Sequence, residues 1–160
     1  VISAFGRLWA ANTTSNNATV FFSDLIAGHV WSTGTSGSLN VDRVWVNGAD
    51  EITGLAAHNG FLFIFGKRQI LIYQNATTPA SMQLSDTVEG IGCIARDSIQ
   101  TTSTDVLFLS NSGVRSLMRT IQEKSSPDPR ILCGVDRRFP SDPPCSWRSG
   151  RQPSDCRLPA

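Results

Sequence analysis

An unbroken run of five apolar residues, Phe61–Phe65, constrains the fold of this chain more than any other feature. It follows Asn59-Gly60, a strong signal for a tight turn between antiparallel strands. Residues 66–69, Gly-Lys-Arg-Gln, are expected to form the next turn, and a second apolar stretch, Ile70–Tyr73, follows. A strand without alternating polar residues has no face for water, so we expect a hairpin buried on both faces. The run is far shorter than the roughly 20 residues that span a bilayer, and no membrane segment is expected.

Further strands are predicted on both sides of this hairpin, where β-branched and aromatic residues alternate with turn sequences. They cover residues 6–11, 18–23, 44–46, 105–110 and 114–117. Asn47-Gly48 is expected to end the third of these strands. Residues 116–124 carry apolar side chains at helical spacing and predict one short helix.

The strand units resemble one another. Leu8, Leu62 and Leu107 occupy matching places in three units, and a period of about 40–50 residues with a few strands per unit is typical of β-propeller blades. Residues 1–127 are therefore predicted to be all-β, a fragment of a propeller-like fold with two to three blades built from antiparallel hairpins. A closed ring usually needs at least four blades, and the chain starts at Val1 instead of Met, so we expect a piece of something larger or a processed chain. The same strands could form a β-sandwich.

Residues 128–160 differ sharply in composition. They hold six of the eight prolines, three of the four cysteines, and six arginines with no lysine. Such dense proline stops helices and central strands. The cysteine spacing lacks the close pair of a zinc site. This tail is interpreted as disordered or as out-of-frame translation, with a small cysteine-bearing or basic module as a further reading.

Few residues are suited to catalysis. His29 and His58 are the only histidines, and neither has a partner at metal-binding or catalytic spacing. Cys93 lies among apolar neighbours and is expected to be buried. Gly90-Ile91-Gly92 lacks the third glycine of a dinucleotide loop, and the carboxylates at 50, 51, 86 and 89 fit turns and loop edges. We therefore expect no enzyme, no catalytic residue, no metal and no cofactor.

Four residues are candidates for contact with a partner. Lys67 and Arg68 are expected at the tip of the central hairpin, where a ring of copies would place them as a basic collar against DNA phosphates. Trp31 and Trp45 are candidate loop contacts for a protein or glycan. The alternatives are a solvated hairpin tip for the cations and packing between blades for the tryptophans. The net charge of +1 gives the whole chain no basic field for nucleic acid.

The segment from Asp50 to Tyr73 resembles the tail nozzle proteins of short-tailed bacteriophages, also called tail tubular protein B or packaged-DNA stabilization proteins. The shared pattern is an acidic residue, Ile-x-x-Leu, a turn, an apolar strand, Phe-Gly, a polar pair and Ile-x-x-Tyr. Other segments fit the family as well: residues 7–9, 20–24, 28–31, 90–95 and 105–110. The resemblance covers about residues 1–125 and leaves out the tail.

The resemblance implies a structural virion protein located in the phage tail. It implies a homo-oligomer, a hexameric ring around the DNA exit channel, in contact with other tail proteins such as an adaptor, needle or fibre. The ring would retain the packaged double-stranded DNA and conduct it during ejection, without reading its sequence. A non-enzymatic propeller that binds protein or glycan through its loops is the alternative.

Overall fold

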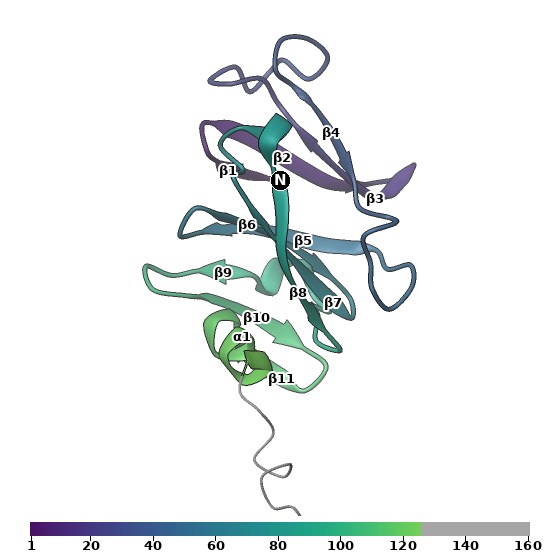
Figure 1. Ribbon diagram of the computed structural model, residues 1–160, viewed down its shortest axis with the longest axis vertical. Helices are drawn as coiled ribbons and strands as arrows, with labels where there is room; N and C mark the ends of the chain where they lie inside the picture. The colour runs from purple at the N-terminus through teal and green to yellow at the C-terminus, as the bar shows by residue number, and fades with distance from the viewer. Residues whose placement is uncertain (126–160) are drawn as a thin grey trace, which may run out of the picture. The chain divides into compact units, whose positions relative to one another are not determined.

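A computed structural model describes residues 1–125, which form three antiparallel β-sheets and one helix (Figure 1). The first sheet holds β1 (Ile2–Ala4), β2 (Arg7–Thr13), β3 (Asn16–Phe22) and β4 (Gly37–Asn40). The second holds β5 (Ile52–His58), β6 (Phe61–Gly66), β7 (Gln69–Gln74) and β8 (Gln83–Glu89). The third holds β9 (Gln100–Thr101), β10 (Val106–Ser110) and β11 (Gly113–Ser116), and helix α1 (Leu117–Ser125) follows it. Short 3-10 turns lie at Pro79–Ser81 and Arg96–Ser98.

The chain divides into two units, Val1–Ser126 and Pro127–Ala160. The predictions for the tail, residues 128–160, fall outside the described residues. Within each sheet, every strand pairs with the next along the chain, and every pairing is antiparallel. The prediction of an all-β fold made from antiparallel hairpins is confirmed. The described residues form no closed ring.

The three leucines that marked the repeat lie on the second strand of each sheet. Leu8 is on β2, Leu62 on β6 and Leu107 on β10. The first two sheets also begin with the same kind of hairpin turn. Phe5 and Gly6 have φ angles of 55° and 69°, and Asn59 and Gly60 have 48° and 80°. Two central residues with positive φ are typical of the turn whose twist matches a two-residue hairpin.

The first hydrophobic core lies between the first and second sheets. Trp9 and Phe22 supply the first sheet's side of it, and their rings are 5.3 Å apart. Leu62, Ile64 and Leu71 supply the second sheet's side, and each is fully buried. Alternate residues of β6 and β7 therefore face the first sheet.

The second core lies between the second and third sheets. Phe63, Phe65 and Ile70 point away from the first core and pack against residues of β10 and α1. Phe65 meets Phe108 of β10 with ring centroids 5.1 Å apart. The middle sheet therefore has a core on each face, as the unbroken apolar run predicted, and Figure 1 shows the three sheets as successive layers.

The prediction of a strand at residues 44–46 is wrong. Residues 42–44 form a turn, in which Val44 N–H donates to the carbonyl of Val41 at 3.0 Å. Apolar side chains of this segment fill the first core from a turn and not from a strand, since Trp45 and Val41 are buried there.

The predicted helix at residues 116–124 is confirmed as α1, and Asp105 holds its start. One carboxylate oxygen of Asp105 accepts a hydrogen bond from Met118 N–H at 3.1 Å and another from Val106 N–H at 2.6 Å. The other oxygen accepts from the hydroxyl of Ser116. A carboxylate at this position satisfies an amide that the first turn of a helix leaves unpaired.

Asp105 is expected to make the stability depend on pH. Burial opposes its ionisation, but hydrogen bonds from Ser116, Met118 and Val106 outweigh that effect and lower the pKa of Asp105 below its ordinary value of 3.8. The stabilisation is therefore complete above the unfolded pKa and is lost as the pH falls through the lower, folded pKa. We expect Asp105→Asn to unfold at lower urea concentration than the parent at pH 7, with a gap that narrows below about pH 4. The exposed Asp97→Asn is the control, and an Asp105→Asn gap that stays constant down to pH 3 would contradict the assignment.

Candidate functional site

A polar groove of about 850 Å³ lies where three hairpin tips come together. The β2–β3 turn and the start of β3 contribute residues 14–17, the β6–β7 turn contributes Lys67 and Arg68, and the β10–β11 turn contributes Asn111. Residues 49–51, which precede β5, form a further part of the wall. The sequence repeat accounts for this grouping, since each sheet places the turn after its second strand at the same end.

The backbone of the Lys67-Arg68 tip is held by Asp50. One oxygen of this carboxylate accepts from Lys67 N–H at 3.2 Å and from Glu51 N–H at 2.9 Å. The other accepts from Arg68 N–H at 2.8 Å. Hydrogen bonds to a charged acceptor are stronger than those between neutral groups, so Asp50 stabilises this conformation of the tip.

The segment at Gly92 holds the same tip from another side. Cys93 N–H donates to the carbonyl of Gly66 at 2.9 Å. A Cβ atom at Gly92 would lie 2.4 Å from the carbonyl oxygen of Gly66 and 2.5 Å from the amide nitrogen of Arg68. Gly92 is therefore needed for close approach of two backbones, and no phosphate-binding role is required to explain it.

The two tip cations have different partners. Lys67 forms an ion pair with Glu51, and the Arg68 guanidinium donates to the carbonyl of Ala49 at 3.4 Å. Lys67 and Arg68 share the groove with three carboxylates, those of Asp42, Asp50 and Glu51, which leaves an excess of one negative charge. The surface ion pair of Lys67 is worth about 0–1 kcal/mol, so it holds the Lys67 side chain only weakly.

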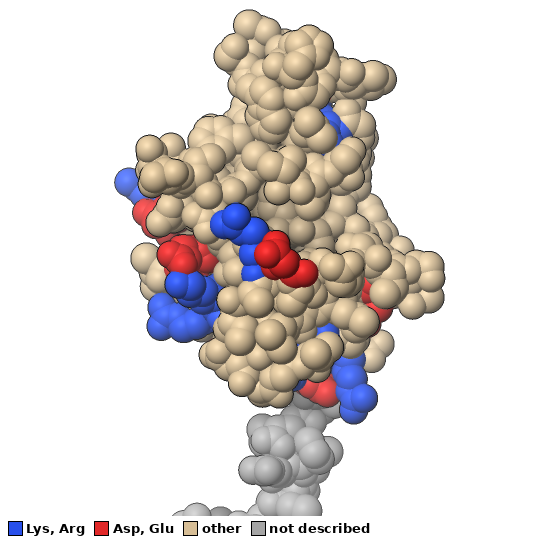
Figure 2. Space-filling model, turned by 180° about the vertical axis from the view of Figure 1, so that it is seen from behind, with Lys and Arg blue, Asp and Glu red and all other residues tan. Residues whose placement is uncertain are grey.

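Charged side chains are distributed unevenly over the molecule. Residues 1–41 contain only Arg7 and Asp24 as charged residues. Figure 2 shows the corresponding scarcity in the upper part of the molecule, and acidic and basic groups lying side by side lower down. The groove thus lies at the border of a surface of mixed sign.

The two candidate tryptophans have different environments. Trp45 is 6% exposed and belongs to the first core, so its expected role as a loop contact is corrected to packing between sheets. Its Nε1 has no hydrogen-bond partner within the described part of the chain. Trp31 is 39% exposed and lies outside the groove. The structure therefore does not bring the two tryptophans together with Lys67 and Arg68.

The loop that carries Trp31 is fixed by a polar cluster that sequence reasoning missed. Arg7 is buried and donates to the carbonyls of Ser23 at 2.8 Å and Thr35 at 3.1 Å. Asp24 accepts hydrogen bonds from the hydroxyl and backbone N–H of Thr35 and from Leu25 N–H, which lower the pKa of Asp24. Arg7 and Thr35 are 28 residues apart, and no local pattern links them.

The remaining chemical candidates lie in structural settings. Cys93 is a buried free cysteine whose thiol donates to the carbonyl of Ala95 at 3.1 Å. His58 is partly exposed, with a buried Nε2 that lacks a partner in residues 1–125. No group of three His, Cys, Asp or Glu side chains in those residues is placed to hold a metal ion. None of their helices has the length and apolar character needed to cross a membrane.

No protein-family model, curated protein or solved structure matches this chain. The resemblance to tail nozzle proteins therefore stays a prediction that rests on the residues of the Asp50–Tyr73 segment and its flanks.

Removing the Asp50 carboxylate is expected to release the tip. Asp50→Ala deletes three hydrogen bonds to backbone amides, and we expect a loss of about 1.5–3 kcal/mol in the free energy of unfolding. The amides of Lys67 and Arg68 should also exchange with solvent faster, as measured by hydrogen exchange. Asp42→Ala is the matched control, because Asp42 is exposed and lines the same groove. Equal exchange rates in both variants would contradict the role of Asp50.

Proposed function

We propose that this chain is a structural part of a bacteriophage tail, a ring-forming nozzle component that retains packaged DNA and conducts it during ejection. The observation that carries the proposal is the series of three hairpin sheets stacked through apolar faces. The blades of a β-propeller are small antiparallel sheets that pack face to face in this way around a central channel. The work of such a ring is mechanical and needs no catalytic group.

The order of the strands is compatible with a channel. Each sheet begins with an edge strand, β1, β5 or β9, and β5 contacts both β1 and β9. In a propeller the equivalent strands of successive blades surround the central axis. On this proposal the three edge strands face the axis.

On this proposal the two cations at the hairpin tip contact DNA, and not the groove as a whole, because the carboxylates of the groove outnumber them. Asp50 and Gly92 hold the backbone of the tip that carries Lys67 and Arg68, so the backbone loses little conformational entropy when a phosphate binds to the side chains. Each cation that meets a phosphate releases counterions and makes binding dependent on salt. Binding of this type tracks the DNA backbone without reading bases.

A binding module is the second candidate function. Asparagine and threonine side chains of the groove, among them Asn16, Asn17, Asn40 and Asn111, offer paired donors and acceptors of the kind that sugar hydroxyls need. On this alternative a glycan or a protein loop occupies the groove, and no ring is required.

Two measurements on the full-length protein test the proposal. Electron microscopy and native mass spectrometry are expected to show closed rings of identical subunits. Titration with double-stranded DNA should show binding that weakens as the salt concentration rises. In the double variant Lys67→Ala/Arg68→Ala, the slope of the logarithm of the binding constant against the logarithm of the salt concentration should fall by roughly 2 per bound subunit. Arg43→Ala/Arg96→Ala, at two exposed positions outside the groove, is the control. Monomers at every concentration would overturn the ring, and glycan binding that is lost in Asn16→Ala would favour the alternative.

A further inference from the structure

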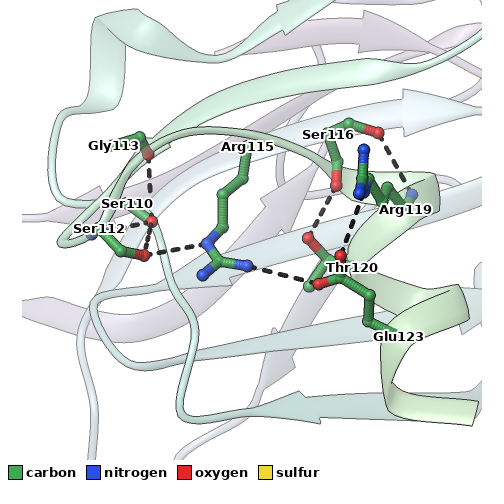
Figure 3. A network of polar contacts seen from close by, with 8 residues as sticks. All are labelled: Ser110, Ser112, Gly113, Arg115, Ser116, Arg119, Thr120 and Glu123. Carbon is green, nitrogen blue, oxygen red and sulfur yellow. Dashed lines mark hydrogen bonds and ion pairs between the residues drawn. The ribbon is translucent and has the colours of Figure 1, made fainter. Parts of the chain in front are cut away.

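A second polar pocket, of about 330 Å³, lies between β11 and α1. Its lining includes Arg115 of β11, Arg119 and Glu123 of α1, and Ser112 of the preceding turn. Figure 3 shows Arg115 extended between Ser112 and Glu123, with Arg119 on the helix beside the same glutamate. Two guanidinium groups thus converge on one carboxylate.

Contacts hold the Arg115 side chain in place, whereas the Arg119 side chain is largely exposed to solvent. Arg115 Nε donates to the Ser112 hydroxyl at 3.0 Å, and its side chain is 31% exposed. Arg115 Nη1 lies 3.7 Å from one oxygen of Glu123, a distance beyond a good hydrogen bond. Arg119 Nε donates to the other oxygen at 3.1 Å, and the Arg119 side chain is 79% exposed. Arg115 is therefore positioned in advance, and Glu123 satisfies it incompletely.

Further donors of both arginines remain available. Among residues 1–125, no hydrogen bond engages Arg115 Nη2 or either Nη atom of Arg119. The three charged groups carry a net charge of +1, because one carboxylate faces two guanidiniums. A group with three oxygens and a larger negative charge would engage more of these donors than a carboxylate does.

Glu123 is poorly placed for stabilising the helix. It lies near the C-terminal end of α1, and Arg119 lies near the N-terminal end, so both charges oppose the helix dipole. Other contacts already hold α1: the Asp105 cap, the buried Leu117, and Lys124 bonded to Asp86 and the Thr87 carbonyl. A helical pair of this spacing contributes only about 0.3–0.5 kcal/mol. Attachment of the helix does not require this triad.

We propose that Arg115 and Arg119 form a binding site for a phosphate group, which Glu123 occupies when no ligand is bound. Glu123 is 53% exposed, so its side chain turns into solvent at little cost when a phosphate enters. This site goes beyond the proposed function, because it requires neither a ring nor a channel. The phosphate belongs either to a nucleic-acid backbone or to a free phosphate ion, and both present the same chemistry to the arginines.

The test is a titration of the full-length protein with inorganic phosphate at constant ionic strength, followed by NMR of the backbone amides and arginine Nε–H groups. Saturable shifts are expected at residues 112–123. Glu123→Gln removes the internal competitor and should tighten binding by about threefold to tenfold, whereas Arg115→Gln and Arg119→Gln should each weaken it by at least about tenfold. Arg43→Gln is the control. Because Arg119 is largely exposed, its variant keeps the test valid if Arg115→Gln fails to fold.

The distinctive expectation is that Glu123→Gln raises the affinity for phosphate, whereas the two arginine variants lower it. Absence of saturable shifts, or a Glu123→Gln variant that binds no better than the parent, would overturn the site. A repeat with a short DNA duplex identifies the source of the phosphate. Shifts at the same amides indicate a DNA backbone, and a response to inorganic phosphate alone indicates a free ion. Ring formation is measured separately, so a negative result for this phosphate site does not bear on the nozzle proposal.

Discussion

Replacing Trp9 with alanine is expected to lower the free energy of unfolding by about 3–5 kcal/mol. Trp9 is fully buried between the first and second sheets, with the ring of Phe22 5.3 Å away. Its Nε1 also donates to the carbonyl of Ala4 at 3.0 Å, which ties β2 to β1. Small domains have a total stability of about 5–15 kcal/mol, so this loss removes a large part of it. Urea denaturation followed by circular dichroism measures the change.

Trp31→Ala is the matched control for this prediction. Trp31 has the same side chain but lies in a loop and is 39% exposed. We expect its loss to cost less than about 1 kcal/mol. A Trp9→Ala variant that loses as little stability as is expected for Trp31→Ala would show that the first core does not depend on Trp9.

Gly92→Ala is expected to cost about 3 kcal/mol or more, although it adds a single methyl group. The added Cβ would lie 2.4 Å from the Gly66 carbonyl oxygen and 2.4 Å from the Lys67 carbonyl carbon. Both atoms belong to a backbone that Asp50 also holds, so neither side can move aside freely. The loop and the β6–β7 tip must separate, and unfolding in urea should begin at a clearly lower concentration.

Gly90→Ala provides the comparison two residues away. A Cβ at Gly90 meets no atom within 4 Å, and the only cost comes from its positive φ of 74°. That cost is about 1 kcal/mol, so Gly90→Ala should fall between the parent and Gly92→Ala. A Gly90→Ala variant as unstable as Gly92→Ala would show that chain conformation, and not close contact, sets the requirement for glycine.

The sequence predicted strands well where apolar character was strong and local. Residues 61–65 and 70–73 lie in β6 and β7, and their burial on both faces follows directly from the lack of polar residues. Strand β5 (Ile52–His58) was missed because glycine and alanine give it weak strand propensity, and it becomes a strand through pairing with β6. The Val44–Val46 prediction failed for the opposite reason, since apolar residues also fill cores from turns.

The site could be predicted only in part. Sequence placed Lys67 and Arg68 at a hairpin tip, and the structure has them there. It could not predict that Asp50 fixes the tip or that Gly92 lies against it, because these contacts join segments 17 to 26 residues apart. The pairing of Arg115 with Glu123 could not be predicted for a related reason, because the two charges become neighbours only when helix α1 packs beside strand β11.

The middle sheet, with a core on each face, also sets how the chain tolerates mutation. In a library of single substitutions, tolerance of polar replacements should alternate along β2 and β10, because every second side chain of these strands points away from the core. Along β6 and β7 that alternation should vanish, because Leu62, Phe63, Ile64 and Phe65 are all at most 3% exposed. Sequences that drift from this one over evolutionary time should therefore diverge fastest in the outer layers, and keep the hairpin of residues 61–73 recognisable longest.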